Sequence, residues 1–273
     1  MNRTSPVKLL KSMGRIPGHA QALFLLVRGF LRLARAKAGN DINAVRGAFD
    51  IGDAEFKLNL YAVPAGYLES DPATRALADQ FYGSETRFSE KLLSQCPVGS
   101  LGWALKRCTF DRGLDPEFYR ECLHEDLHTR RGWFSFRARQ VHDLLHVVTG
   151  LPTTHTGEMA IFAFIGANCH TYSAYLIAVA GIFGQLMRRK EKLVLMNRIF
   201  SLAWLSGESI RPLLGVKFED LLHLPLFDVR AQLGIPRYGF GEKMFPEAKL
   251  YGYSFRHLDR SDARLALLEA CNL

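Results

Sequence analysis

Two histidines and two acidic residues in the middle of the chain have the types and spacing of a metal site. They are His142, Asp143, His146 and Glu158, within the segment RARQVHDLLHVVTGLPTTHTGE. On a helix, His142 and His146 are one turn apart, about 40° around the axis, and Asp143 lies about 100° from His142, so the three side chains can converge. A Gly150-Leu151-Pro152 break ends that helix. A following helix that packs back against it brings the Glu158 carboxylate to the same point.

Imidazole and carboxylate groups make a mixed nitrogen and oxygen site that suits zinc or another divalent transition metal. The sequence therefore predicts His142, Asp143, His146 and Glu158 as metal ligands. Asp143 has three open roles: direct ligand, general base or orienting partner of a histidine, since in the related HExxH signature the residue after the first histidine is the base. A non-metal alternative pairs Asp143 with Arg139 and lets His142 cap neighbouring groups.

The adjacent histidine and aspartate are also similar to the HD-domain phosphohydrolases. That class needs a further histidine upstream and an aspartate downstream, for which His124, His128 and Asp220 are only nominal candidates. P-loop, G-x-S-x-G and GxGxxG motifs are absent from the sequence. We therefore favour the site of His142, Asp143, His146 and Glu158 over the HD-domain interpretation.

The charge of +8 is concentrated at one end of the chain. Residues 1–40 carry eight Lys or Arg and no Asp or Glu, whereas the remaining basic and acidic residues balance. Arg28, Arg32 and Arg35 recur at helical spacing among apolar residues over 19–37, which predicts a basic amphipathic helix. We expect it to face an anionic membrane surface, with a core-packing helix or a mitochondrial presequence as alternatives. No nucleic acid is expected, because stacking aromatic residues are nearly absent there.

The most apolar segment, residues 159–187, contains no Asp, Glu, Lys or Arg. Its length suits a transmembrane helix, but Asn168, His170 and Gln185 are costly in lipid. We favour a long central helix (158–188) buried in a helical domain, which can also line a tunnel for a hydrocarbon chain.

Helical periodicity dominates the rest of the chain, and it predicts a single all-α, multi-helix domain. Alternation over Phe56–Ala62 indicates a short strand or an extended loop. We divide the chain into a basic N-terminal segment (1–40), a helical core (41–236) and an irregular C-terminal extension (237–273) that ends in a short helix over 261–271. The five cysteines are scattered and lack CxxC spacing, which favours a reducing compartment.

Three motifs make the chain similar to the Coq4 family of coenzyme Q (ubiquinone) biosynthesis proteins. The family signature, HDxxH followed by eleven residues and Glu, matches His142 to Glu158. The P-x-GSLG motif matches Pro97–Gly102, and R-x-x-LGI matches Arg230–Ile235. His155 stands where the family pattern has an apolar residue, and the long tail after Pro236 is a further departure.

The resemblance implies an all-helical fold and a zinc or similar ion on the four predicted ligands. It also implies removal of the ring carboxyl of a polyprenylated hydroxybenzoate, with or without oxidation at that carbon, by a carbon–carbon lyase (4-hydroxy-3-methoxy-5-polyprenylbenzoate decarboxylase type). A phenolic carboxylate needs a Lewis acid, which agrees with the metal prediction. We expect Arg139 to help bind this substrate. The non-catalytic alternative is a prenyl-lipid-binding organiser of the ubiquinone biosynthetic complex.

The partners expected from this resemblance are the prenylated precursor, other ubiquinone-biosynthesis proteins and a second copy of the chain in a homodimer. Attachment is expected to be peripheral, on the cytoplasmic face of a bacterial inner membrane or, alternatively, on the matrix side of the mitochondrial inner membrane.

Overall fold

A computed structural model describes residues 18–36, 42–58, 60, 62–117, 119–120, 128–188 and 193–245. These residues form a single all-α domain, as predicted, in which the only β-type pairing is one bridge between Ser100 and Pro225. The longer helices are α2 (Gly18–Arg35), α3 (Ile42–Lys57), α8 (Arg130–Thr149), α9 (His155–Cys169), α10 (Tyr172–Arg188) and α11 (Leu193–Glu208). The shorter ones are α4 (Ala62–Ser70), α5 (Pro72–Asp79), α6 (Glu90–Leu93), α7 (Leu101–Cys108), η2 (Phe110–Arg112), η5 (Leu213–Gly215), α12 (Phe218–Leu221), α13 (Leu226–Gln232) and α14 (Gly241–Met244).

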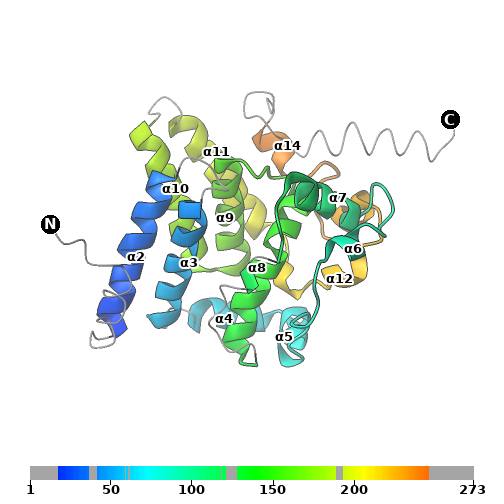
Figure 1. Ribbon diagram of the computed structural model, residues 1–273, viewed down its shortest axis with the longest axis horizontal. Helices are drawn as coiled ribbons and strands as arrows, with labels where there is room; N and C mark the ends of the chain where they lie inside the picture. The colour runs from blue at the N-terminus through cyan, green and yellow to red at the C-terminus, as the bar shows by residue number, and fades with distance from the viewer. Residues whose placement is uncertain are drawn as a thin grey trace.

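Helix α8 runs through the middle of the molecule and carries the predicted histidines (Figure 1). It begins where the Thr129 side chain accepts a hydrogen bond from the Gly132 N–H at 3.0 Å, as an N-cap does. It ends at Gly150, whose φ of 69° lies in the left-handed region that a helix C-terminus favours. Its apolar side chains, including Trp133 and Val147, are part of the main core, in which α9 is also buried.

Helices α2, α3 and α10 lie side by side around a second, smaller core (Figure 1). Leu33, Ile51 and Ile177 come from these three helices and are buried together. The backbones of α2 and α3 can approach closely because Gly29 and Gly47 have no side chain. A Cβ on Gly29 would lie only 2.7 Å from the Gly47 carbonyl oxygen. Two glycines therefore set the distance between α2 and α3.

The amphipathic helix predicted over 19–37 is confirmed as α2, but its polar face differs from the expectation. Two of its arginines, Arg28 and Arg32, bind Asp50 on α3. The most exposed apolar side chains of α2 are Leu23 and Val27, which are 62% and 52% exposed. Arg28 and Arg32 thus stabilise the α2–α3 pair, whereas Arg35 is exposed together with apolar residues of α2.

The predicted long central helix is wrong in one respect, because residues 158–188 form two helices rather than one. His170 ends α9 with a φ of 55°, and α10 begins at Tyr172. The Tyr67 ring stacks on the His170 ring at 3.6 Å, and Glu55 accepts a hydrogen bond from the Tyr172 N–H at 2.9 Å. Contacts from α3 and α4 therefore stabilise a break that the local sequence does not mark. None of the described helices is both long and apolar enough to cross a membrane.

One further expectation is corrected, and the first part of the C-terminal extension is described. The alternating stretch Phe56–Ala62 is no strand: α3 continues through Lys57, a turn follows at Leu58, and α4 begins at Ala62, while residues 59 and 61 lie outside the described part. In the C-terminal extension, residues 241–244 form helix α14, and Met244 and Phe245 are buried in the main core. The helix predicted over 261–271 lies outside the described residues.

Candidate metal centre

A hairpin of α8 and α9 brings three of the predicted ligands together. The turn between the helices is tight: a Cβ on Gly157 would lie 1.7 Å from the Pro152 carbonyl oxygen, so only glycine fits there. The Thr154 side chain accepts a hydrogen bond from the Gly157 N–H at 3.2 Å and starts α9. Glu158 therefore lies in the first turn of α9, where a carboxylate is favoured by the helix dipole.

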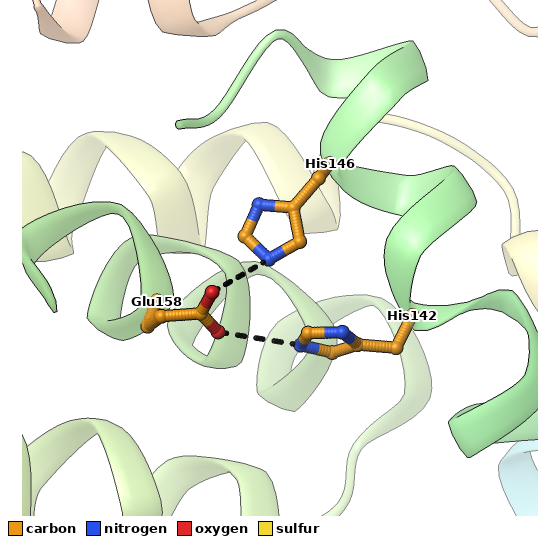
Figure 2. A group of neighbouring side chains, drawn as sticks. All are labelled: His142, His146 and Glu158. Atoms are coloured by element: carbon orange, nitrogen blue, oxygen red, sulfur yellow. Dashed lines mark ion pairs between the residues drawn. The ribbon is translucent and has the colours of Figure 1, made fainter. Parts of the chain in front are cut away.

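His142 and His146 point from α8 toward Glu158, as Figure 2 shows. The His146 Nε2 atom lies 3.3 Å from Glu158 Oε1, and the His142 Nε2 atom lies 3.5 Å from Glu158 Oε2. Each of the three residues offers one ligand atom, and these three atoms all lie within 4.8 Å of one another. The His146 side chain is 1% exposed, whereas those of His142 and Glu158 are 23% and 21% exposed.

The outer nitrogen of each imidazole has an acceptor of its own. Asp143 Oδ1 lies 3.0 Å from His142 Nδ1, and the Leu151 carbonyl oxygen lies 2.9 Å from His146 Nδ1. A carbonyl or an ionised carboxylate can only accept, so both Nδ1 atoms carry the hydrogen. In the neutral rings, Nε2 then keeps its lone pair, directed at the centre of the group. This is the tautomer that metal-binding histidines commonly use.

The charges of the group shift two pKa values in opposite directions. Burial disfavours the charged form of His142, but interactions with Asp143 and Glu158 outweigh it and raise the pKa of His142 to about 10. Burial also disfavours the Glu158 carboxylate, but the charge of His146 and contacts with both histidines hold the pKa of Glu158 well below its usual value. Glu158 is therefore ionised at neutral pH, which is the state that binds a cation.

The three side chains fit a divalent metal on two observations. Ligand atoms about 2.1 Å from a tetrahedral zinc ion lie about 3.4 Å from one another. Glu158 places Oε1 3.3 Å from His146 and Oε2 3.5 Å from His142, and the three ligand atoms lie within 4.8 Å of one another, so the side chains would move slightly inward around an ion. The His142 Nε2 atom is buried and makes no hydrogen bond of normal geometry among the described residues; the Glu158 carboxylate lies 3.5 Å away, so an ion bound between the two would take the place of the proton on Nε2. Three protein ligands also leave a fourth position for water or substrate.

Asp143 is the predicted ligand that the structure does not bring into this group. Its carboxylate faces Nδ1 of His142, on the far side of the ring from Glu158. Of its three open roles, this geometry corresponds to the orienting partner. Arg139, which we expected to bind substrate, lies one turn before His142 with its guanidinium 4.9 Å from the Phe49 ring of α3.

The remaining histidine and aspartate candidates lie elsewhere. His128 packs edge-on against the Phe81 ring, and Asp220 accepts a hydrogen bond from the Tyr82 hydroxyl, so neither joins the group required by the HD-domain interpretation. His124 lies outside the described residues. The Leu151 carbonyl, which accepts from His146, was not predicted from the sequence; the signal for it is the Gly-Leu-Pro turn, since this turn folds the chain back over the helix end.

The fold and this group together define an all-helical protein with two histidines and a glutamate gathered across one helical hairpin. The family model described as "Coenzyme Q (ubiquinone) biosynthesis protein Coq4" matches residues 25–238. The chain therefore belongs to the Coq4 family of ubiquinone biosynthesis proteins.

Curated relatives carry the same description. The chain is 32% identical over 163 residues to the mitochondrial ubiquinone biosynthesis protein COQ4 of Eremothecium gossypii, covering 59% of this chain and 49% of that protein. It is 25% identical over 242 residues to the Zygosaccharomyces rouxii protein of the same name, covering 86% and 69%. A Drosophila ananassae COQ4 homolog is 28% identical over 166 residues, covering 61% of each. The match thus spans about half to two thirds of these relatives.

A solved structure has the same fold. The crystal structure of a candidate ubiquinone biosynthesis protein from Nostoc punctiforme superposes with a TM-score of 0.66 at 19% sequence identity. The superposition covers 79% of this chain and 97% of that chain. At this identity the likeness concerns the fold alone.

Proposed function

We propose that His142, His146 and Glu158 bind one divalent transition metal, such as Zn²⁺, and that Asp143 orients His142. The observation that carries this proposal is the convergence of three ligand atoms within 4.8 Å on the α8–α9 hairpin. The hydrogen bonds that both Nδ1–H groups donate support it, because they fix the tautomers that leave Nε2 available for the ion.

The reaction we propose is decarboxylation of a polyprenylated hydroxybenzoate during ubiquinone biosynthesis. When bound, the metal supplies a Lewis acid for the phenolic carboxylate and for the charge that develops on the ring. The bond between the ring and the carboxyl carbon breaks, CO₂ leaves, and a proton takes its place on the ring carbon. The oxidative form of the reaction requires an external oxidant in addition.

The residues around the group suit an aromatic acid. The Phe162 ring lies 5.4 Å from the His142 ring and provides an apolar surface beside the metal position. Arg139, one turn before His142, provides a positive charge on the same helix. We propose that the prenyl tail lies along the apolar helices α9 and α10.

Metal analysis with matched variants tests the site first. Purified wild-type protein is expected to carry about one equivalent of metal, and Glu158→Ala and His142→Ala to carry almost none. His128→Ala is the control, because His128 lies outside the group. CO₂ release from a prenylated hydroxybenzoate is then expected from wild type and His128→Ala only. Turnover that survives in His142→Ala contradicts the proposed activity.

The alternative function, a non-catalytic prenyl-lipid-binding organiser of the biosynthetic complex, is favoured by one observation. Helices α2 and α10 pack against each other, and both carry exposed apolar side chains: Leu23 and Val27 on α2 and Met187 on α10 are 62%, 52% and 68% exposed. This alternative predicts that prenyl lipid and other ubiquinone-biosynthesis proteins co-purify with the chain even when His142→Ala removes the metal. The expected homodimer is checked by light scattering of the same preparations.

We propose peripheral attachment to a membrane for the same reason. The names of the three curated relatives include the word mitochondrial, which supports a mitochondrial location; within it we propose the matrix side of the inner membrane, and the cytoplasmic face of a bacterial inner membrane is the other candidate. Release from membranes by high salt or high pH is the expected result.

A further inference from the structure

The end of helix α8 lies directly beyond His146, and its carbonyl groups have an unusual partner. The last carbonyls of a helix have no partner within the helix. Here the Gly150 N–H donates to the His146 carbonyl at 3.0 Å. The next two carbonyls, of Val147 and Val148, accept hydrogen bonds from a single arginine, Arg230, at 2.8 Å and 2.9 Å.

Arg230 comes from α13, more than 80 residues further along the chain, and is 0% exposed. Its third nitrogen donates to the Arg237 carbonyl at 3.0 Å. A buried guanidinium is costly unless it is well hydrogen-bonded, and a cation at a helix C-terminus is favoured by the helix dipole. The contacts therefore hold both the end of α8 and the segment that begins at Arg237.

That segment packs on the same turn. A Cβ on Gly239 would lie 2.4 Å from the Thr149 carbonyl oxygen, and a Cβ on Gly241 would lie 1.9 Å from the Gly150 carbonyl oxygen. Backbone thus lies against backbone with no room for a side chain. The end of α8 is enclosed from two sides, by Arg230 and by the glycines.

The enclosed turn leads to the acceptor that sets the tautomer of His146. Leu151 follows Gly150 directly, and its carbonyl accepts from His146 Nδ1 at 2.9 Å. The position of that carbonyl depends on how the chain leaves the helix, and Arg230 fixes the two carbonyls just before the exit. A shift of this turn would release Nδ1 and let the ring rotate away from Glu158.

We propose that Arg230 is a positioning residue of the metal centre: by holding the end of α8 it keeps the Leu151 carbonyl against His146 and so keeps Nε2 of His146 directed at Glu158. The effect of Arg230 on metal binding rests on the proposed metal site. The effect of Arg230 on the hydrogen bond between His146 and Leu151 is expected in the metal-free protein as well. Partners that orient a metal-binding histidine typically contribute about 10- to 100-fold in metal affinity.

Arg137 provides a matched control. It is also 0% exposed and also donates to a backbone carbonyl, that of Val216, at 2.7 Å. It differs in that its main partner is the Glu219 carboxylate and that it lies in the first half of α8. Arg137→Lys is therefore expected to destabilise the fold without moving the end of the helix.

The experiment compares Arg230→Lys, Arg137→Lys and wild type by Co²⁺ titration, using the visible absorption of the bound ion, and by thermal unfolding. Arg230→Lys is expected to bind Co²⁺ at least about tenfold more weakly with an altered spectrum. Arg137→Lys is expected to lower the unfolding temperature but to keep the wild-type affinity and spectrum. Equal Co²⁺ affinity in Arg230→Lys and wild type, or an equal loss in both variants, overturns the inference.

A second measurement separates this inference from the proposed function. In metal-free protein, the His146 Nδ1–H is expected to give a slowly exchanging downfield proton resonance, assigned by its loss in His146→Gln. Arg230→Lys is expected to lose it or to exchange it faster, whereas Arg137→Lys keeps it. If wild type binds no Co²⁺, the proposed function fails, and this resonance still decides the role of Arg230. A resonance unchanged in Arg230→Lys contradicts it.

Discussion

Two helical hairpins of this protein each bring opposite charges together in a largely buried place, and they do so differently. Between α2 and α3, Asp50 is 8% exposed and accepts hydrogen bonds from Arg28 Nε at 3.0 Å and from Arg32 Nη1 at 2.6 Å. Between α8 and α9, the nitrogen–oxygen separations at Glu158 are 3.3 Å and 3.5 Å, longer than most charge-assisted hydrogen bonds.

The difference indicates which cluster is structural and which can bind a ligand. In the α2–α3 hairpin the carboxylate oxygens are hydrogen-bonded to guanidinium groups, which present no lone pair to an ion. In the α8–α9 hairpin the histidine nitrogens can present lone pairs, and the spaces between them and Glu158 match the ligand separations of a metal. Charge and burial alone therefore do not identify a site; donor type and spacing do.

The largest expected effect is on metal binding by the α8–α9 hairpin. Glu158→Gln removes the anionic ligand while it keeps the size of the side chain, so metal affinity is expected to fall more than about 100-fold, beyond the usual effect of an orienting partner. Competition with a chromogenic chelator measures this affinity. Asp50→Asn is the control, since it removes a buried carboxylate from the other hairpin. A similar fall in Asp50→Asn would contradict the division between the two clusters.

The next effect concerns stability and is expected in the α2–α3 hairpin. Asp50→Ala leaves Arg28 and Arg32 facing each other without their anion, and since these arginines are 29% and 33% exposed, water offsets part of the cost. We expect a loss of about 2 kcal/mol in the free energy of unfolding, below the range for fully buried pairs. Urea unfolding of metal-loaded protein measures it, and metal content is expected to stay at the wild-type value. An Asp50→Ala protein as stable as wild type would show that this cluster contributes nothing.

The two hairpins also differ in how far the sequence predicts them. The group on α8 and α9 is predictable for two reasons. Helical periodicity places His142 beside His146, and the Gly-Leu-Pro break predicts a turn after which the next helix packs back against α8. Helix α3 was not predicted. It contains Gly47 and Gly52, which disfavour a helix locally, and its position depends on close packing with α2.

The features that the sequence did not predict are the break at His170, the orientation of Asp143 and the contacts of Arg230, and the first and last of these depend on contacts between distant residues. The break at His170 depends on Tyr67 and Glu55, which lie about a hundred residues earlier in the chain. The orientation of Asp143 toward Nδ1 of His142 depends on its side-chain conformation, and helical spacing does not define it. Arg230 is more than 80 residues from the carbonyls it holds. Periodicity finds the ligands, and tertiary contacts determine their orientation.

A smaller effect tests the orienting role of Asp143. Asp143→Asn can still accept a hydrogen bond from His142 Nδ1 but removes the negative charge, so we expect metal affinity to fall about tenfold, at the low end for orienting partners. The same chelator competition measures it, beside Asp143→Ala, which removes the acceptor as well and is expected to bind more weakly. If both variants lose as much affinity as Glu158→Gln, Asp143 is a direct ligand instead.

The last effect is the pH dependence of metal binding, which distinguishes a cluster that can lose a proton from one held by arginine. Because the pKa of His142 is raised to about 10 in the metal-free protein, an ion must displace a proton from Nε2 at neutral pH. Metal affinity is therefore expected to rise with pH, by at most about tenfold per unit below pH 10, and to fall as the pH is lowered.

Calorimetry of zinc binding in two buffers of different ionisation enthalpy measures the proton released. The Asp50→Asn protein is expected to release the same amount, because the arginines of α2 stay charged throughout this range. Zinc affinity that is equal at pH 6 and pH 8, with no proton released, would show that the metal-free group holds no proton at His142 and would contradict its raised pKa.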